Sequence, residues 1–302
     1  MMRENHDRRA MEIPRALKLP DGTTIAYRVT PAESRRPGRA LVLLHGLASN
    51  LTRWSEFVAQ SSLAARWDLI RVDLRGHGGS PAPGPLSLER WADDLAAILE
   101  REAHPRAVLV GHSLGAQVAL VFAVRHRERT AGLVLIDPLF REALRGRAAL
   151  IARGGPLFRA GAGMVRAGHA LGLGRKSVPP LDLAELDREA RKALASAEST
   201  EAFVRHYSSP RADLRYFPTE HYLQELAEMF RRAPPLEAIR APVLMLLSRG
   251  GTFADPARTQ LVAAGFHDAE IVMVEAEHWP LTERPVEVRR AIAEWCGRRL
   301  RG

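Results

Sequence analysis

The sequence is poor in cysteine and has no long apolar run. Cys296 is the sole cysteine of the 302 residues, which excludes a disulfide framework and a cysteine-based metal cluster. No uninterrupted apolar stretch approaches the roughly 20 residues that span a bilayer. Residues 1–15 are charged throughout and lack the apolar core of a secretory signal. These absences predict a soluble, cytoplasmic protein.

Lysine is also scarce, although the chain is basic. Three of its 44 basic residues are lysines and 41 are arginines, against 35 acidic residues, so the formal net charge is +9. The excess is local, because residues 140–180 contain eight basic residues and one acid, Glu142. Phe140 and Phe158 are the aromatic residues of that stretch, too few to stack bases between the charges. We therefore expect no nucleic-acid partner.

The basic stretch 140–180 also carries apolar residues between its arginines. They are Leu144, Ile151, Leu157, Phe158, Met164, Val165 and Leu171. One interpretation is a surface that makes peripheral contact with an anionic membrane or admits long acyl substrates. The alternative is a solvated arginine face above ordinary internal packing. The sequence leaves both open.

Apolar segments of strand length alternate with longer segments of helical period. This alternation predicts βαβ units and a mainly parallel twisted sheet flanked by helices, an α/β fold. An Asp21–Gly22 turn predicts a hairpin in front of it. The expected strands are 16–19, 24–29, 40–44, 68–72, 107–110, 132–136, 242–247 and 270–274. The expected helices are 54–65, 88–100, 114–126, 256–264 and 285–300.

The alternation stops between residues 140 and 235. This segment is helical in character but irregular, with a Gly/Arg-rich piece followed by helical pieces over 182–197 and 220–231. It is too long for a plain loop between two strands, so we predict an inserted helical cap. The predicted organisation is a core domain of residues 1–139 and 236–302, with the cap over 140–235.

The sharpest motif is GHSLG at residues 111–115, directly between an apolar strand and an apolar helix. A Gly-x-Ser-x-Gly sequence in this setting forms a tight, strained turn, and the flanking glycines avoid collisions that a Cβ would make. The turn raises the Ser113 hydroxyl above the sheet beside a helix N-terminus, where negative charge is favoured. Ser113 is the predicted nucleophile, against the alternative of a structural Gly-Ser turn.

A second motif, HGL at residues 45–47, ends the strand 40–44. Attack by a serine on an acyl group requires backbone N–H donors aimed at the developing oxyanion. A glycine-containing loop at a neighbouring strand end can supply one donor, and the residue after the serine the other. We assign these donors to Leu47 and Leu114. A simple strand-to-loop turn is the alternative.

Among eleven histidines, His278 stands out by its position. It follows the last predicted strand and precedes the last helix, where a general base that closes the chain order Ser…Asp…His is expected. Strand ends distant in sequence can converge in space on Ser113. His112 should point away from the hydroxyl, and His77 should order its own loop.

The chain resembles the α/β-hydrolase superfamily over most of residues 16–300 outside the cap. The matching strings are LVLLHGLAS, RVDLRGHGGS, VLVGHSLGAQVAL, GLVLID and EHWPLTERPVEVRRAIAEW. The resemblance implies Ser113 as nucleophile, His278 as base, and Leu47 and Leu114 as oxyanion donors, with no metal or organic cofactor. A serine at this position differs from the aspartate of haloalkane dehalogenases and epoxide hydrolases. One departure is Glu277, where many members have glycine.

Two carboxylates are candidates for the acid of the triad. Many members place it after the penultimate strand, in a Gly-x-x-Asp pattern, but here no acid follows that strand until Asp255. Asp255 precedes Pro256 and a helix, which also fits a simple N-cap. The alternative is Asp137, at the end of the strand 132–136, where some branches carry the acid. We favour Asp137 and keep Asp255 as the other candidate.

These residues predict a serine hydrolase that cleaves an apolar carboxylic ester through an acyl-enzyme. Members with the same serine and histidine also hydrolyse C–C or thioester bonds, so these activities are the first alternative. A binding protein that retains the fold without catalysis is a further alternative. The sequence does not determine the oligomeric state.

Overall fold

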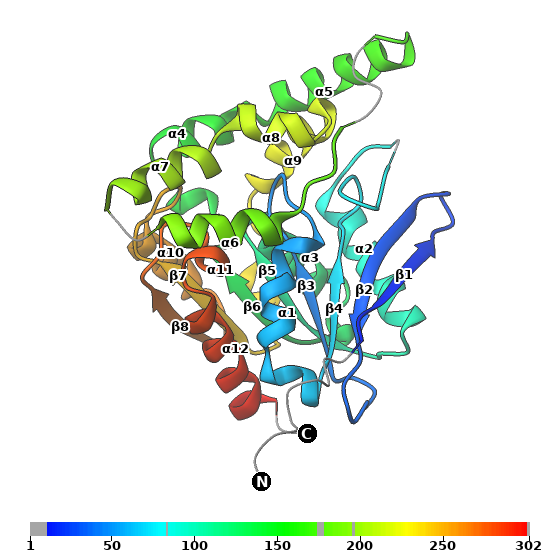
Figure 1. Cartoon of the computed structure of the whole chain (residues 1–302), viewed down its shortest axis with the longest axis vertical. Helices are drawn as coiled ribbons and strands as arrows, with labels where there is room; N and C mark the ends of the chain where they lie inside the picture. Colours follow the sequence, from blue (N-terminus) through cyan, green and yellow to red (C-terminus); the bar gives the residue numbers. More distant parts are fainter. Residues whose placement is uncertain (1–10, 83, 174–177, 195–196, 301–302) are drawn as a thin grey trace.

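The computed structural model describes residues 11–82, 84–173, 178–194 and 197–300. Its described strands form one sheet in the order β1-β2-β4-β3-β5-β6-β7-β8, as Figure 1 shows. β2 is antiparallel to both neighbours, and the pairs from β4 to β8 are parallel. The predicted mainly parallel sheet is confirmed. Its strands are β1 Ile13–Lys18, β2 Thr24–Thr30, β3 Ala40–Leu44, β4 Asp68–Val72, β5 Ala107–His112, β6 Thr130–Ile136, β7 Val243–Ser248 and β8 Ala269–Val274.

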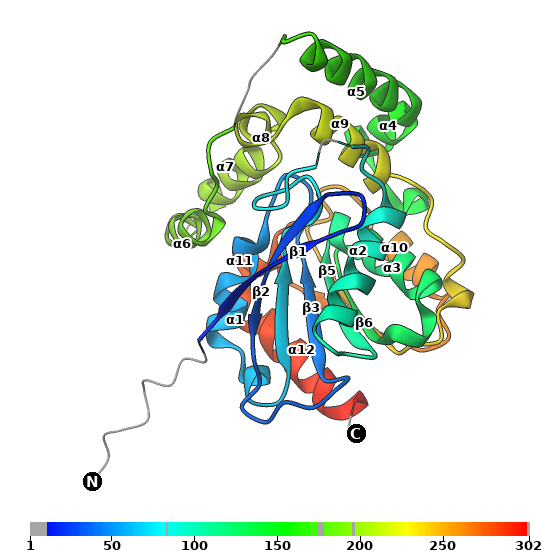
Figure 2. The ribbon, with the colours of Figure 1, turned by 90° about the vertical axis from the view of Figure 1, so that its right-hand side faces the viewer.

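Helices cover both faces of this sheet. In Figure 2, α2 (Leu88–Arg101), α3 (Leu114–Arg125) and α10 (Pro256–Ala263) lie on one side. The other side carries α1 (Ser55–Gln60), α11 (Pro280–Glu283) and α12 (Pro285–Arg299). The central strands are apolar on both faces because each face packs against one of two separate hydrophobic clusters.

The prediction of one continuous helix over residues 54–65 is wrong. The segment divides into a 3₁₀ turn over Leu51–Trp54, the helix α1, and a second 3₁₀ turn over Ser62–Ala65. Side chains cap both turns, because Asn50 accepts the Thr52 N–H and Ser61 accepts the Leu63 N–H. These local bonds compete with a continuous helix.

The segment 140–235 forms a layer of helices across one end of the sheet (Figures 1 and 2). Its Gly/Arg-rich part is more regular than the sequence indicates, since it forms α4 and then a four-turn helix, α5, which packs against α9. None of the described helices is both long and apolar enough to cross a membrane. The helices of this segment are α4 Gly146–Ile151, α5 Gly155–Ala170, α6 Leu183–Ala193, α7 Ala197–Tyr207, α8 Pro210–Tyr216 and α9 Thr219–Met229.

Candidate active site

Ser113 occupies a strained turn between β5 and α3. Its backbone has φ 51° and ψ −111°, a conformation that costs of order 1–3 kcal/mol for a residue with a Cβ. Both neighbouring glycines are required by close backbone contacts. A Cβ on Gly111 would lie 2.6 Å from the Ala116 nitrogen, and one on Gly115 would lie 2.7 Å from the His45 carbonyl oxygen. The turn therefore holds the hydroxyl at the carboxyl end of the sheet.

His278 lies in the turn after β8, with its Nε2 3.2 Å from the Ser113 Oγ. Burial lowers the pKa of His278 well below the ordinary histidine value, and the neighbouring His112 lowers it further. The His278 ring is therefore neutral at pH 7, and its Nε2 can accept a proton. His112 Nε2–H donates to the His278 backbone carbonyl at 2.8 Å, so His112 supports the turn that carries the base.

A half-buried carboxylate also fixes this turn. Glu283, in α11, accepts the backbone N–H groups of Glu277 and Trp279 at 3.1 and 3.0 Å. Glu277 takes the place of the glycine common in the family, and its carboxylate accepts the Thr252 hydroxyl at 2.9 Å. The departure noted in the sequence is thus accommodated by a contact to the loop after β7.

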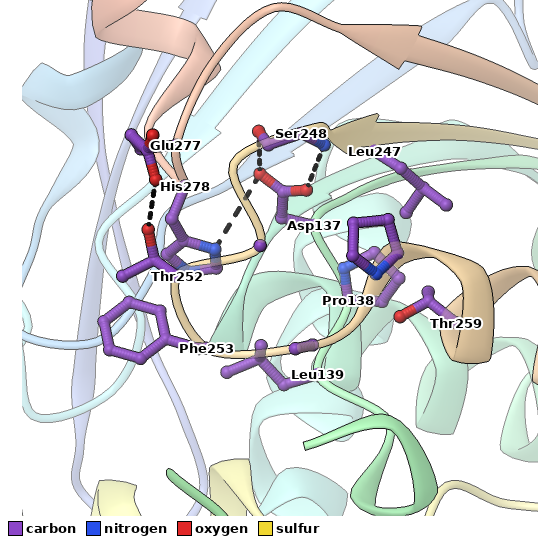
Figure 3. A pocket seen from close by; sticks show the side chains of 13 residues that line it. Asp137, Pro138, Leu139, Leu247, Ser248, Thr252, Phe253, Thr259, Glu277 and His278 are labelled. Atoms are coloured by element: carbon purple, nitrogen blue, oxygen red, sulfur yellow. Dashed lines mark hydrogen bonds and ion pairs between the residues drawn. The ribbon is translucent and has the colours of Figure 1, made fainter. Parts of the chain in front are cut away.

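Asp137 lies on the far side of the His278 ring (Figure 3). It follows β6, the neighbour of β5, and has a left-handed backbone with φ 44°. Its carboxylate accepts the Ser248 N–H at 2.7 Å and the Ser248 hydroxyl at 2.6 Å. Its Oδ2 also lies 3.8 Å from His278 Nδ1, beyond hydrogen-bond distance. The structure therefore brings Ser113, His278 and Asp137 together in this order.

Burial raises the pKa of Asp137 to about 7. The two hydrogen bonds from Ser248 oppose this rise, and the charge of Glu283 adds to it. Beside Asp137 and His278 lies a cavity of about 20 Å³, large enough for a single water molecule. This carboxyl group can therefore change its charge near neutral pH while it faces the histidine.

The structure separates Asp255 from this arrangement. Asp255 is the N-cap of α10, and its carboxylate accepts the Arg258 N–H at 3.1 Å. The hydrogen bond that the Arg258 N–H donates lowers the pKa of Asp255. Pro256 follows at the first helical position, as the N-cap interpretation of the sequence requires.

Both predicted oxyanion donors belong to segments next to Ser113. Leu114 is the first residue of α3, and Leu47 follows Gly46, where a Cβ would lie 3.5 Å from the Ser113 Cβ. Within the described part of the chain, neither the Leu47 nor the Leu114 N–H has a hydrogen-bond partner. A free donor at a helix N-terminus also carries part of the positive end of the helix dipole.

The loop that carries Leu47 is bound by a helix of the inserted segment. Glu225, on α9, is fully buried, and its Oε2 accepts the Ala48 N–H at 3.1 Å. Ala48 has a left-handed φ of 46°. The same oxygen lies 3.1 Å from His77 Nε2. Burial alone would lower the pKa of His77, but the Glu225 carboxylate outweighs this effect and raises it.

A cavity of about 480 Å³ opens beside Ser113 and His278. Core residues and inserted helices both line it, and the apolar part of the wall includes Phe253, Trp279, Leu226 and Met229. Met229 ends α9, and its Sδ lies 3.8 Å from the Ser113 Oγ. This volume is in the range of pockets for small-molecule ligands.

The described residues contain no group of three or more histidine, cysteine or acidic side chains that could hold a metal ion. Cys296 is buried in α12, and burial raises the pKa of its thiol to about 12. At Ser113 the structure places a serine hydroxyl, a neutral histidine and an aspartate next to one another, an arrangement that can support nucleophilic catalysis.

The family model for the alpha/beta hydrolase fold matches residues 39–285. The chain belongs to the α/β-hydrolase family. This α/β hydrolase is 28% identical to epoxide hydrolase 3 of Xenopus tropicalis over 302 aligned residues, which cover 92% of this chain and 76% of that protein. It is 41% identical to a pimeloyl-(acyl-carrier protein) methyl ester esterase of Aeromonas hydrophila over 101 residues, 33% of this chain and 37% of that protein.

The fold of this hydrolase also resembles solved structures over nearly its whole length. A hydrolase from Pseudomonas aeruginosa PA01 matches with a TM-score of 0.68 at 23% identity, covering 94% of this chain and 98% of that one. At this level of identity the match supports the fold alone.

Sequence reasoning missed three residues at the site of this α/β hydrolase. Ser248 ends β7, beside β6, and only the strand order shows that it meets Asp137. Glu225 and Met229 lie one turn apart on α9, in an ordinary amphipathic pattern that does not indicate contact with a loop more than a hundred residues away.

Proposed function

We propose that this α/β hydrolase is a serine hydrolase that cleaves carboxylic esters through an acyl-enzyme. The observation that carries the proposal is the distance of 3.2 Å between His278 Nε2 and the Ser113 Oγ, at a strained turn that opens on a cavity. The neutral state of the buried His278 ring supports a role as general base.

Acylation begins when the Ser113 Oγ attacks the ester carbonyl carbon while His278 Nε2 takes the hydroxyl proton. The electron pair of the carbonyl moves to its oxygen, which receives hydrogen bonds from the Leu47 and Leu114 N–H groups. The ester C–O bond then breaks, and the His278 imidazolium returns its proton to the leaving alcohol. The acyl group remains on Ser113.

Deacylation repeats these steps with water. His278 takes a proton from the water as its oxygen attacks the acyl carbon, and the bond to Ser113 breaks. The proton returns to the Ser113 Oγ, and the carboxylic acid leaves. Asp137 is the proposed acid, because its negative charge beside Nδ1 stabilises the imidazolium in both halves of the reaction. The 3.8 Å separation is expected to shorten when the ring becomes charged.

Glu225 is proposed as a positioning residue. Its bond to the Ala48 N–H holds the residue next to Leu47 in a left-handed conformation. The His77 ring in turn holds the Glu225 carboxylate, so that α9 contributes to the geometry of the oxyanion donor without contact with the substrate.

The apolar wall of the cavity and the similarity to a methyl ester esterase support an apolar ester as the substrate. The similarity to an epoxide hydrolase carries less weight for the chemistry, because Ser113 offers a hydroxyl where epoxide hydrolases use an aspartate. Hydrolysis of a thioester or C–C bond needs the same residues, so a panel of matched substrates distinguishes these activities.

The test is a fluorophosphonate probe, which reacts with an activated serine whatever the substrate. We expect stoichiometric labelling of the intact chain, measured by mass spectrometry, and no labelling of Ser113→Ala. A folded protein that stays unlabelled between about pH 6 and 9 would contradict the proposal, because His278 is neutral in that range and Asp137 is charged in its upper part.

A further inference from the structure

The helix α5 has two faces with different surroundings. One face packs on α9, where Ala162 is buried and a Cβ on Gly161 would lie 3.4 Å from Leu223. On the same side, His169 lies 3.2 Å from Glu220 and Arg159 lies 3.1 Å from Glu228. These contacts account for the inner face of α5.

The outer face of α5 is apolar and exposed. Leu157, Met164 and Leu171 follow one another at intervals of seven residues, and they are 76%, 76% and 80% exposed. The exposed Ala160 and Ala167 lie between them on the same line. Such spacing keeps all five side chains on one side of a helix. Figure 2 shows α5 at the outer end of the molecule, above α9.

Most large exposed apolar side chains of the described residues gather here. Nine such side chains are exposed in total. Six of them lie on or directly after α4 and α5, namely Leu150, Ile151, Leu157, Met164, Leu171 and Leu173. A concentration of this kind marks a surface that binds an apolar partner.

The charge of the same segment identifies that partner. No aspartate or glutamate occurs between Glu142 and Asp182, whereas this stretch contains seven basic residues. Arg153 is exposed four residues before Leu157, whereas Arg166 is exposed on the other side of α5, two residues after Met164. A second copy of this chain would present the same positive charge without a carboxylate to pair with it, so self-association through this face is disfavoured. An anionic lipid surface offers both the charge and the apolar interior that the face lacks.

We propose that the outer face of α4 and α5 docks on a bilayer that contains anionic phospholipid. Leu157, Met164 and Leu171 enter the boundary between headgroups and acyl chains, and the arginines contact the headgroups. Arg145, which caps α4, and Arg147 and Ile151 within this helix also line the cavity that holds Ser113. Docking would therefore bring one wall of this cavity to the membrane surface.

The test is flotation of the full chain with vesicles of ether-linked lipids, which present no ester to hydrolyse. We expect binding to vesicles of equal parts phosphatidylcholine and phosphatidylglycerol, weak binding to phosphatidylcholine alone, and loss of binding at high salt. Leu157→Ser and Met164→Ser should each weaken binding about tenfold. The matched control is Leu261→Ser on α10, since Leu261 is likewise 76% exposed but lies far from the basic segment in sequence.

The arginines are tested separately. Arg153→Gln should weaken binding about fivefold, while Arg166→Gln, on the other side of α5, and Arg290→Gln on α12 should change it less. Unchanged fluorophosphonate labelling and thermal stability would show that these surface variants are intact.

Three results would overturn the proposal. One is the absence of vesicle binding, and another is binding that Leu157→Ser and Leu261→Ser affect equally. The third is a dimer, detected by light scattering, that Met164→Ser abolishes, since a second copy would then cover this face. Vesicle binding needs no reaction at Ser113, so failure here and failure of the proposed hydrolase activity are distinguishable.

Discussion

The hydrolase core and the inserted segment are stabilised by different kinds of contact. In the core, both faces of the sheet bury large apolar side chains, with Trp54, Trp91 and Trp295 at most 1% exposed. The inserted segment meets the core through a set of polar bonds in addition to apolar contacts such as that of Phe203 with Trp279. The polar bonds join Glu225 to the Ala48 N–H, Gln224 to the Leu86 N–H, Glu228 to the Leu88 N–H, Asp187 to Arg53, and Arg231 to Glu89.

We expect the core to determine the reaction rate and the inserted segment to determine which substrate binds. The proposed catalytic residues lie at the ends of core strands, in backbone conformations that the buried sheet can hold against strain. The inserted helices supply cavity walls and one positioning carboxylate through an interface similar to those between domains. Changes in the core should therefore reduce the rate, whereas most changes in the insertion should alter which substrate binds.

The strongest test of this separation compares two serines that line the same cavity. Ser113→Ala should lower kcat about 10⁴-fold or more, because the nucleophile is lost while the oxyanion donors remain. Ser208→Ala, on the inserted segment, should change kcat less than about threefold, since its hydroxyl donates to the Val204 carbonyl. Steady-state kinetics on one ester measures both. Comparable losses would remove the distinction between the two regions.

The next comparison lies within the core. Asp137→Asn should lower kcat about 10³- to 10⁴-fold, because the charge beside His278 is lost. Asn retains an acceptor for the Ser248 N–H and a donor for its hydroxyl, and it removes a carboxylate whose pKa burial raises to about 7. The free energy of unfolding above pH 7 should therefore not fall. Asp255→Asn is the control and should leave kcat unchanged, since Asn also caps helices well. The reverse order of effects would assign the acid to Asp255.

Glu225 tests the one place where the insertion is expected to affect the rate. Glu225→Ala should lower kcat about 10- to 100-fold with little change in KM, because the loop of Leu47 loses its anchor. Glu225→Gln should recover part of this loss, since its carbonyl oxygen can still accept the Ala48 N–H. Gln224→Ala on the same helix is the matched control. It should cost similar stability, measured by urea unfolding, without the fall in kcat.

The pH profile gives the smallest expected effect. With the Asp137 carboxyl protonated, the pair of Asp137 and His278 lacks the negative charge that supports proton transfer, so kcat/KM should rise with pH through about 7. At pH 6 it should be about tenfold below its plateau. In Asp137→Asn the rising part of the kcat/KM profile should move to lower pH, because the remaining group, His278, has a pKa that burial lowers. If the rise of kcat/KM with pH stays in place in Asp137→Asn, its cause is a group other than Asp137.

The sequence predicts the core better than the insertion for a physical reason. Buried parallel strands need continuous apolar segments between turn residues, and these are visible in a single sequence at Ala40–Leu44 and within Val243–Ser248. The Gly/Arg-rich segment lacks a single apolar stripe, because α5 is apolar both toward α9 and toward solvent. Its helix therefore appears irregular in the sequence.

At the site, local motifs identify Ser113 and His278, since each chemical task requires a particular turn next to a strand. The choice between Asp137 and Asp255 depends on strand order and on the path of the loop after β7, which no local pattern records. Glu225 and Met229 are harder still to predict from the sequence, because their contacts join the sheet to a helix whose packing depends on the whole insertion.

The position of Asp137 after β6 affects which residues near the site can be substituted. With Asp137 as the proposed acid, mutations in the loop over residues 249–255 replace no member of the proposed triad. The same loop carries Phe253, whose ring centroid lies 4.7 Å from that of His278, and it lines the cavity through Thr252 and Phe253. A library confined to these two positions would sample new substrate preferences while it retains every proposed catalytic residue. The same freedom would let natural descendants of this chain diversify their substrates by substitutions in one short loop.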